Sequence, residues 1–192
     1  MRTLVGLSAM DDERATQNIF LVGPMGSGKT AVGKQLARAL RCPFLDSDLE
    51  IVQRTGVDIP YIFDKEGEAG FRAREREIID ELSRRSGIVL ATGGGAILLP
   101  ENRTALRARG MVVYLETSVA QQVSRVRHGE NRPLLAGATD MTARLEALMI
   151  QRDPLYRDTA HWSLRTDGQR VGRVVEQILS HWRAAGDAAP YT

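Results

Sequence analysis

The residues best suited to chemistry lie in a glycine-rich segment near the N-terminus. Residues 23–30 read Gly-Pro-Met-Gly-Ser-Gly-Lys-Thr and match the pattern G-x-x-x-x-G-K-[ST]. In this pattern, backbone N–H groups surround phosphate oxygens at a helix N-terminus, whose partial positive charge favours an anion. The Lys29 ammonium would reach the β- and γ-phosphates, and the Thr30 hydroxyl would bind Mg²⁺. The segment therefore predicts a nucleoside triphosphate site, the alternative being a glycine-rich turn without a ligand.

A second candidate group is a pair of acids, Asp46 and Asp48, which follows a short apolar run. Alternate residues at the end of a strand point to the same side, so both carboxylates can face one site. One could serve Mg²⁺ while the other contacts an acceptor hydroxyl, which suits a phosphotransferase better than an enzyme that activates water. The alternative is a solvated turn whose acids cap the next helix.

Two further segments have features of a ligand site. Thr92 is followed by three consecutive glycines at the end of an apolar run, and such glycines allow close approach of the backbone to a ligand. Arg132 lies in a stretch without periodicity, residues 128–139, which we interpret as a lid that closes over the triphosphate. A plain loop and an exposed arginine are the alternatives, and arginine is abundant here because only three of the 26 basic residues are lysines.

These residues require elements that position them. Apolar runs predict strands at 18–22, 43–45, 88–91, 111–116 and 162–165. Helical spacing predicts helices at 29–40, 49–55, 59–65, 68–86, 101–109, 118–127 and 140–152, followed by a last helix that Asp167 would cap. Short strands that are apolar on both faces and alternate with helices indicate a parallel sheet between two helical layers.

Length and composition indicate one globular domain. The 192 residues are 43% hydrophobic and 26% charged, which argues against disorder. We expect a domain at 18–183, a flexible N-terminal extension at 1–17 and a tail at 184–192. The net charge of +2 gives no indication of nucleic-acid or membrane binding, and no apolar run approaches the ~18 residues of a membrane span. The single cysteine, Cys42, fits a cytoplasmic protein.

Six motifs together resemble shikimate kinase. They are the segment 23–30, Asp46-Ser47-Asp48, Gly67-Glu68-x-x-Phe71-Arg72, Thr92-Gly93-Gly94-Gly95, Arg132-Pro133-Leu134-Leu135 and Arg152-x-Pro154-Leu155-Tyr156. The resemblance implies ATP-dependent phosphorylation of the 3-hydroxyl of shikimate, giving shikimate 3-phosphate and ADP in aromatic amino-acid biosynthesis. It also implies a P-loop α/β/α fold with a five-stranded parallel sheet and a lid, similar to nucleoside monophosphate kinases, and we expect a monomer.

The resemblance assigns roles at the nucleotide end of the site. Lys29 and Arg132 would contact the transferring phosphoryl group, and Arg125 would lie near adenine. Thr30 and Asp46 would hold Mg²⁺. The ATP-binding residues would be Gly26, Ser27, Gly28, Lys29, Thr30, Ala31, Arg125 and Arg132.

At the acceptor end, the resemblance makes Asp48 the group that hydrogen-bonds the attacking hydroxyl and can take its proton. Arg72 and Arg152 would bind the shikimate carboxylate, since guanidinium groups match a planar anion. The backbone of Gly93, Gly94 and Gly95 would approach the ring.

Two other functions are compatible with parts of the pattern. A gluconate kinase would also act on an acceptor with a carboxylate and hydroxyls. A nucleotide-dependent switch without an acceptor would carry a guanine-reading Asn-Lys-x-Asp motif or an acid at the end of the third strand, and the sequence has neither.

Overall fold

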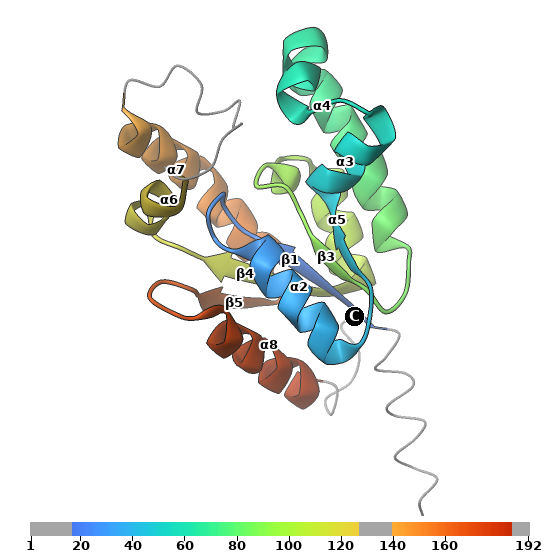
Figure 1. The fold of residues 1–192 in the computed structure, drawn as a ribbon, viewed down its shortest axis with the longest axis vertical. Helices are drawn as coiled ribbons and strands as arrows, with labels where there is room; N and C mark the ends of the chain where they lie inside the picture. The colour runs from blue at the N-terminus through green and yellow to red at the C-terminus, as the bar shows by residue number, and fades with distance from the viewer. Residues whose placement is uncertain (1–16, 127–139, 186–192) are drawn as a thin grey trace, which may run out of the picture.

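Five parallel strands form the centre of the computed structural model, which describes residues 17–126 and 140–185. Their order across the sheet is β2-β3-β1-β4-β5 (Figure 1). The strands are β1 (Asn18–Val22), β2 (Phe44–Asp46), β3 (Val89–Ala91), β4 (Gly110–Glu116) and β5 (Trp162–Arg165). The parallel five-stranded sheet inferred for this chain is therefore confirmed. Strands β1 and β5 match their predicted bounds fully, and the other three lie within one residue of theirs at each end.

Helices cover both faces of this sheet (Figure 1). One face packs against α2 (Lys29–Leu40) and α8 (Val171–Ala185). The other packs against α4 (Ile59–Ser83), α5 (Pro100–Arg109) and α7 (Met141–Thr159). The remaining elements are α3 (Ser47–Thr55), which contacts α4, α6 (Val119–Val126), which contacts α7, and the short 3₁₀ helix η1 (Ala96–Leu98).

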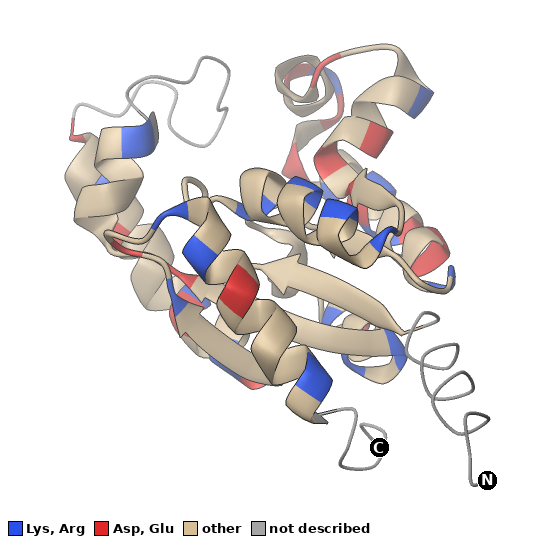
Figure 2. Ribbon diagram, turned by 60° about the horizontal axis from the view of Figure 1, so that its bottom comes forward, with Lys and Arg blue, Asp and Glu red and all other residues tan. Residues whose placement is uncertain are grey.

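Alternating side chains of the central strands fill two separate cores. In β1, Phe20 and Val22 pack toward α4 and α5, whereas Ile19 and Leu21 pack toward α2 and α8. All four are at most 1% exposed. Burial of apolar surface on both faces stabilises the three-layer arrangement, at about 25 cal/mol per Å² removed from water. Figure 2 agrees with this pattern, because charged residues lie on the helices and connecting segments while the strands are almost free of them.

Two helices differ most from their expected bounds. The predicted helices at 59–65 and 68–86 form one element, α4, which is kinked at Gly67, where φ is 69°, and which ends at Ser83. Helix α7 continues to Thr159, beyond the predicted end near Arg152, and contains Pro154. Proline lacks an N–H, so the carbonyl of Ile150 loses its helical donor. Ile150 is exposed, and water can take the place of that donor.

The prediction that Asp167 caps the last helix is wrong. The last helix begins at Val171, four residues beyond it. The Asp167 carboxylate instead accepts hydrogen bonds from the Thr117 hydroxyl at 2.8 Å and from the Ser118 N–H at 3.0 Å. Asp167 therefore connects the loop after β5 to the start of α6.

The remaining domain predictions fall largely outside the described residues. The lid at 128–139 lies wholly outside them, and so do all but the last residue of the extension and all but the first two residues of the tail. None of the described helices is long and apolar enough to cross a membrane.

Replacement of Asp167 by alanine tests whether its carboxylate holds the segment at the start of α6. The change leaves a partly buried hydroxyl and N–H without their acceptor, so the free energy of unfolding should fall by about 1–2 kcal/mol. Urea unfolding of Asp167→Ala measures the loss. Asp158→Ala removes an exposed aspartate whose side chain makes no hydrogen bond to a described residue, and it should change stability by less than about 0.5 kcal/mol. An equal loss in both variants would contradict the assignment.

Candidate functional site

A cavity of about 560 Å³ opens at the carboxyl ends of three neighbouring strands, β1, β2 and β3. Parallel strands end at the same edge of a sheet, so the loops that follow them converge there. The cavity is lined by Met25, Gly26, Gly28, Lys29, Thr30, Ala31, Asp46, Asp48, Ile59, Phe63, Phe71, Arg72, Glu75, Thr92, Gly93, Gly94, Gly95, Arg125 and Arg152. Segments that lie far apart in the sequence thus form one site.

The glycine-rich segment 23–30 joins β1 to α2 as a phosphate-binding loop, or P-loop. Gly28 precedes the first residue of α2 with a φ of 91°, so the loop turns directly into the helix N-terminus. The Lys29 ammonium folds back over the loop and donates to the carbonyl oxygens of Gly23 at 2.6 Å and Pro24 at 2.8 Å. The loop therefore combines the Lys29 ammonium with the N–H groups at the N-terminus of α2, and both kinds of group bind phosphate.

Thr30 and Asp46 form a polar pair beside this loop. The Thr30 hydroxyl donates to Asp46 Oδ2 at 2.9 Å. The other oxygen, Oδ1, accepts the N–H groups of Asp48 and Leu49 and so caps α3. A hydroxyl and a carboxylate are hard oxygen ligands, and Mg²⁺ is commonly held by one or two such groups together with phosphate. These two residues fit a magnesium ion.

Asp46 and Asp48 both face the cavity, but strand alternation is not the reason. The strand ends at Asp46, and Asp48 belongs to the first turn of α3. The turn from strand to helix, closed by the Asp46 cap, aims both carboxylates at the cavity. Capping was the alternative interpretation of this pair, and Asp46 combines it with its contact to Thr30.

Gly93 leaves room for two carboxylates. A Cβ atom on this residue would lie 2.6 Å from Asp48 Oδ1 and 2.7 Å from Glu75 Oε1. The Glu75 side chain is fully buried, and its Oε1 accepts no hydrogen bond from a described residue. Burial and, to a smaller extent, Asp48 raise the pKa of Glu75, Arg72 and Arg152 oppose the rise, and the resulting pKa is about 7.

Arg72 is held by carboxylates on its own helix. Its Nη1 donates to Glu75 Oε2 at 2.6 Å, and its Nη2 donates to Glu68 Oε1 at 3.1 Å. Burial alone would lower the pKa of Arg72, but these carboxylates raise it. A Cβ atom on Gly95 would overlap the guanidinium, so only glycine at this position lets Arg72 reach the loop after β3.

Arg152, unlike Arg72, has no carboxylate partner among the described residues. It is 5% exposed and makes no ion pair with any residue in 17–126 or 140–185. Its Nη1 lies 3.4 Å from the Gly94 carbonyl oxygen, and its buried Nε has no partner among those residues. Burial lowers the pKa of Arg152. A buried cation with no carboxylate in direct contact is costly, and an anionic ligand would reduce that cost.

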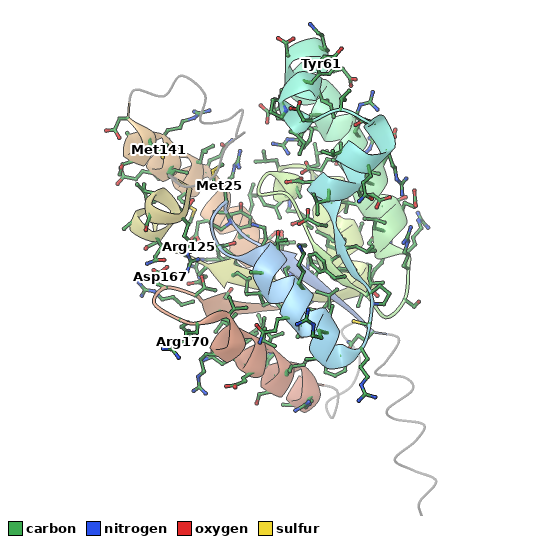
Figure 3. All side chains as sticks on the ribbon, viewed as in Figure 1. Met25, Tyr61, Arg125, Met141, Asp167 and Arg170 are labelled. Atoms are coloured by element: carbon green, nitrogen blue, oxygen red, sulfur yellow. The ribbon has the colours of Figure 1, made fainter. Side chains whose placement is uncertain are left out.

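The rest of the cavity lining consists of apolar side chains from α4 and of residues beside the P-loop. The rings of Phe63 and Phe71 are 4.8 Å apart at their centroids, one on each side of the kink in α4. Arg125 donates to the carbonyl oxygen of Gly26 at 2.8 Å. In Figure 3, Arg125 and Met25 lie near one another beside the P-loop, while Tyr61 marks the outer end of α4.

The structure brings almost all of the expected site residues into this one cavity. Ser27 is the exception among the described residues, since it is buried in the P-loop rather than exposed to the cavity. Arg132 lies outside the described residues. Sequence reasoning missed Glu75, which lies in a run of alternating charges, Arg72-Ala-Arg-Glu-Arg-Glu. Its spacing of three from Arg72 on a helix was the only signal that could have identified it.

This arrangement suits transfer of a phosphoryl group to an anionic alcohol. The P-loop, the two buried guanidiniums of Arg72 and Arg152, and the Asp48 carboxylate line the same cavity. An anionic alcohol bound by the guanidiniums could therefore present a hydroxyl to both Asp48 and a phosphate on the P-loop.

Comparisons with known proteins agree with this chemistry. Residues 25–183 match the family described as shikimate kinase. The shikimate kinase of Halorhodospira halophila is 55% identical over 166 residues, which cover 86% of this chain and 93% of that protein. A structure of shikimate kinase from Acinetobacter baumannii in complex with shikimate is 46% identical, with a TM-score of 0.87 over 92% of this chain and 98% of that one. A gluconokinase from Sinorhizobium meliloti, 17% identical with a TM-score of 0.54 over 91% of this chain and 95% of that one, shares the fold alone.

The buried Glu75 should make stability depend on pH. Its pKa in the folded protein, about 7, is above its ordinary value of 4.5, so the folded state binds more protons between these values. The free energy of unfolding should therefore fall as pH rises from about 4.5 to about 7, by up to about 3 kcal/mol. Urea unfolding at several pH values measures this slope.

Glu75→Gln removes the titrating group and should flatten the slope over this range. Glu77→Gln, an exposed change on the same helix, alters net charge equally and should keep the slope of the unchanged protein. If Glu75→Gln kept that slope as well, Glu75 would not be the group responsible.

Proposed function

The chain belongs to the shikimate kinase family, and on that premise we propose that the cavity at the carboxyl ends of β1, β2 and β3 is where it binds and phosphorylates shikimate. The enzyme transfers the γ-phosphoryl group of ATP to the 3-hydroxyl of shikimate in the pathway to aromatic amino acids. The observation that carries the assignment to this cavity is the buried Arg152 guanidinium, which has no carboxylate partner among the described residues.

The substrate carboxylate would supply that missing counter-charge. It would bind between Arg152 and Arg72, and the planar groups allow paired hydrogen bonds. Arg72 already has Glu75 and Glu68 as partners, so it gains less from the substrate than Arg152 does. Arg152 would therefore contribute most to acceptor binding, while Arg72 fixes the orientation.

ATP would lie at the other end of the cavity. The N–H groups of the P-loop would hold its phosphates, and Lys29 would exchange the carbonyl oxygens of Gly23 and Pro24 for phosphate oxygens. Thr30 and Asp46 would hold Mg²⁺, which when bound neutralises charge on the phosphates. Gly26, Ser27, Gly28 and Ala31 complete the nucleotide side, and Arg125 would lie near adenine.

Asp48 would orient the acceptor for the transfer. The 3-hydroxyl oxygen forms a bond to the γ-phosphorus while the bond from that phosphorus to the bridging oxygen of ADP breaks. The hydroxyl proton moves to the Asp48 carboxylate, and ADP leaves. Arg132 would stabilise the charge of the transferring group, and closure of the lid at 128–139 would keep water from the γ-phosphate.

The alternatives fit less well. The much higher identity to shikimate kinases than to the gluconokinase favours shikimate over gluconate. A switch without an acceptor would not need the Arg72–Arg152 end of the cavity. We expect a monomer to be active, and the composition supports a cytoplasmic location.

Replacement of Asp48 by asparagine should mainly reduce turnover. Asparagine keeps the size of the side chain but cannot accept the proton, so kcat should fall by about 10²–10⁴-fold. The affinity for ATP should stay nearly unchanged. A coupled assay of ADP formation and a direct nucleotide-binding measurement separate these effects, and near-normal turnover would remove Asp48 from the mechanism.

Replacement of Arg152 by alanine should mainly weaken acceptor binding. Loss of a buried guanidinium that faces a carboxylate should raise the KM for shikimate by about 10²-fold or more, with a small effect on the KM for ATP. Arg144→Ala on the exposed side of the same helix is the matched control. A rise in the KM for ATP alone would contradict the assignment of the carboxylate site.

A further inference from the structure

Tyr156 is a buried residue that contacts the site from behind the cavity lining and has no role in the scheme above. It lies on α7 and is 0% exposed. Its hydroxyl donates to the carbonyl oxygen of Gly94 at 2.5 Å. Burial raises the pKa of Tyr156 above its usual range, so the hydroxyl keeps its proton and acts as a donor.

Arg152 competes for the same acceptor. It precedes Tyr156 by four residues, so both side chains lie on one face of α7. Its Nη1 lies 3.4 Å from the Gly94 carbonyl oxygen, a longer distance than that of the tyrosine hydroxyl. Tyr156 thus takes the short hydrogen bond to Gly94, while the guanidinium makes a longer one to the same oxygen and also interacts with the tyrosine hydroxyl.

A second buried hydroxyl holds the other end of this loop. The Gly93 N–H donates to Ser47 Oγ at 3.0 Å, and Ser47 is 0% exposed. The loop at residues 93–95 is therefore fixed from α3 on one side and from α7 on the other. Its position matters, because Gly93 borders Asp48 and Gly95 borders Arg72.

Contacts of the neighbouring residues fix Tyr156 itself. Its ring stacks on that of Tyr114 in β4, with centroids 4.9 Å apart. The Tyr114 hydroxyl donates to Asp153 at 2.8 Å, and Arg157 connects Asp153 to Glu116. These contacts attach α7 to the sheet, and the stacking of the two rings, which does not depend on the Tyr114 hydroxyl, holds Tyr156 in place.

We propose that Tyr156 is a positioning residue for acceptor binding: by satisfying the Gly94 carbonyl oxygen, it leaves the Arg152 guanidinium available for the carboxylate of the substrate. The inference rests on the function proposed above. Without the hydroxyl, Arg152 is the donor left for this partly buried carbonyl, and a charged donor forms the stronger hydrogen bond. The guanidinium would then turn toward Gly94, and substrate would have to compete with that contact.

The test compares Tyr156→Phe with Tyr114→Phe. Each change removes one hydroxyl and keeps the stacked rings. In Tyr114→Phe, Asp153 loses the tyrosine hydroxyl but keeps its hydrogen bond from Arg157. Tyr156→Phe should raise the KM for shikimate by about 10-fold, because the substrate must then displace one hydrogen bond between Arg152 and Gly94, while kcat and the KM for ATP change by less than about twofold. Tyr114→Phe should leave all three within about twofold.

A double-mutant cycle distinguishes positioning from a general structural effect. In an Arg152→Ala background the guanidinium is gone, so Tyr156→Phe should change the KM for shikimate by less than about twofold. The same rise as in the unaltered background would overturn the proposal, and so would an equal rise in the KM for ATP. The shift in Tm caused by added shikimate gives a second measure of affinity if a variant is less stable.

Failure of this inference differs from failure of the proposed function. If Arg152→Ala raises the KM for shikimate and Tyr156→Phe does not, the role of Tyr156 is wrong and the carboxylate site stands. If Arg152→Ala itself leaves the KM for shikimate unchanged, the carboxylate site is wrong, and the role of Tyr156 is overturned with it.

Discussion

Close packing of charged side chains against the loop at residues 93–95 is the constraint on which the rest of the cavity depends. Side-chain atoms at Gly93 would collide with Asp48 and Glu75, and at Gly95 with Arg72. Glycine at these positions lets groups from α3 and α4 meet one strand end at contact distance. The loop also fixes Gly94 between the P-loop and the side chains of α7. The acceptor side of the proposed site and the start of the P-loop therefore pack against the same short piece of backbone.

The charges around that loop are not balanced pair by pair. Arg72 has two carboxylates on its own helix, while Arg152 has none among the described residues. Glu75 shares its surroundings with Asp48, and burial raises its pKa to about 7. The cavity thus contains one guanidinium, that of Arg152, without a carboxylate in contact, and one carboxyl group, that of Glu75, with a pKa near 7. A site with this distribution is costly when empty, and binding of an anionic substrate reduces that cost.

Much of the fold and part of the site were predictable from local patterns. Strand positions followed from short apolar runs, because a parallel sheet buried on both faces needs them, and the P-loop followed from one contiguous motif. The helix cap expected of Asp167 was wrong, since a local capping pattern cannot show that the carboxylate reaches a different helix start. Asp46 and Asp48 reached the cavity through a strand-to-helix turn rather than through strand alternation.

By itself, the sequence determined the phosphate-binding loop, the layered α/β fold and the residue types at each motif, because these depend on spacing within a few residues. Only the tertiary structure decided that Arg72 has carboxylate partners and Arg152 has none, that Glu75 is buried beside Asp48, and that Tyr156 reaches Gly94. Ionisation and hydrogen bonding depend on burial and on neighbours from distant segments. Those neighbours are set by the order of the strands and by how the helices pack on them.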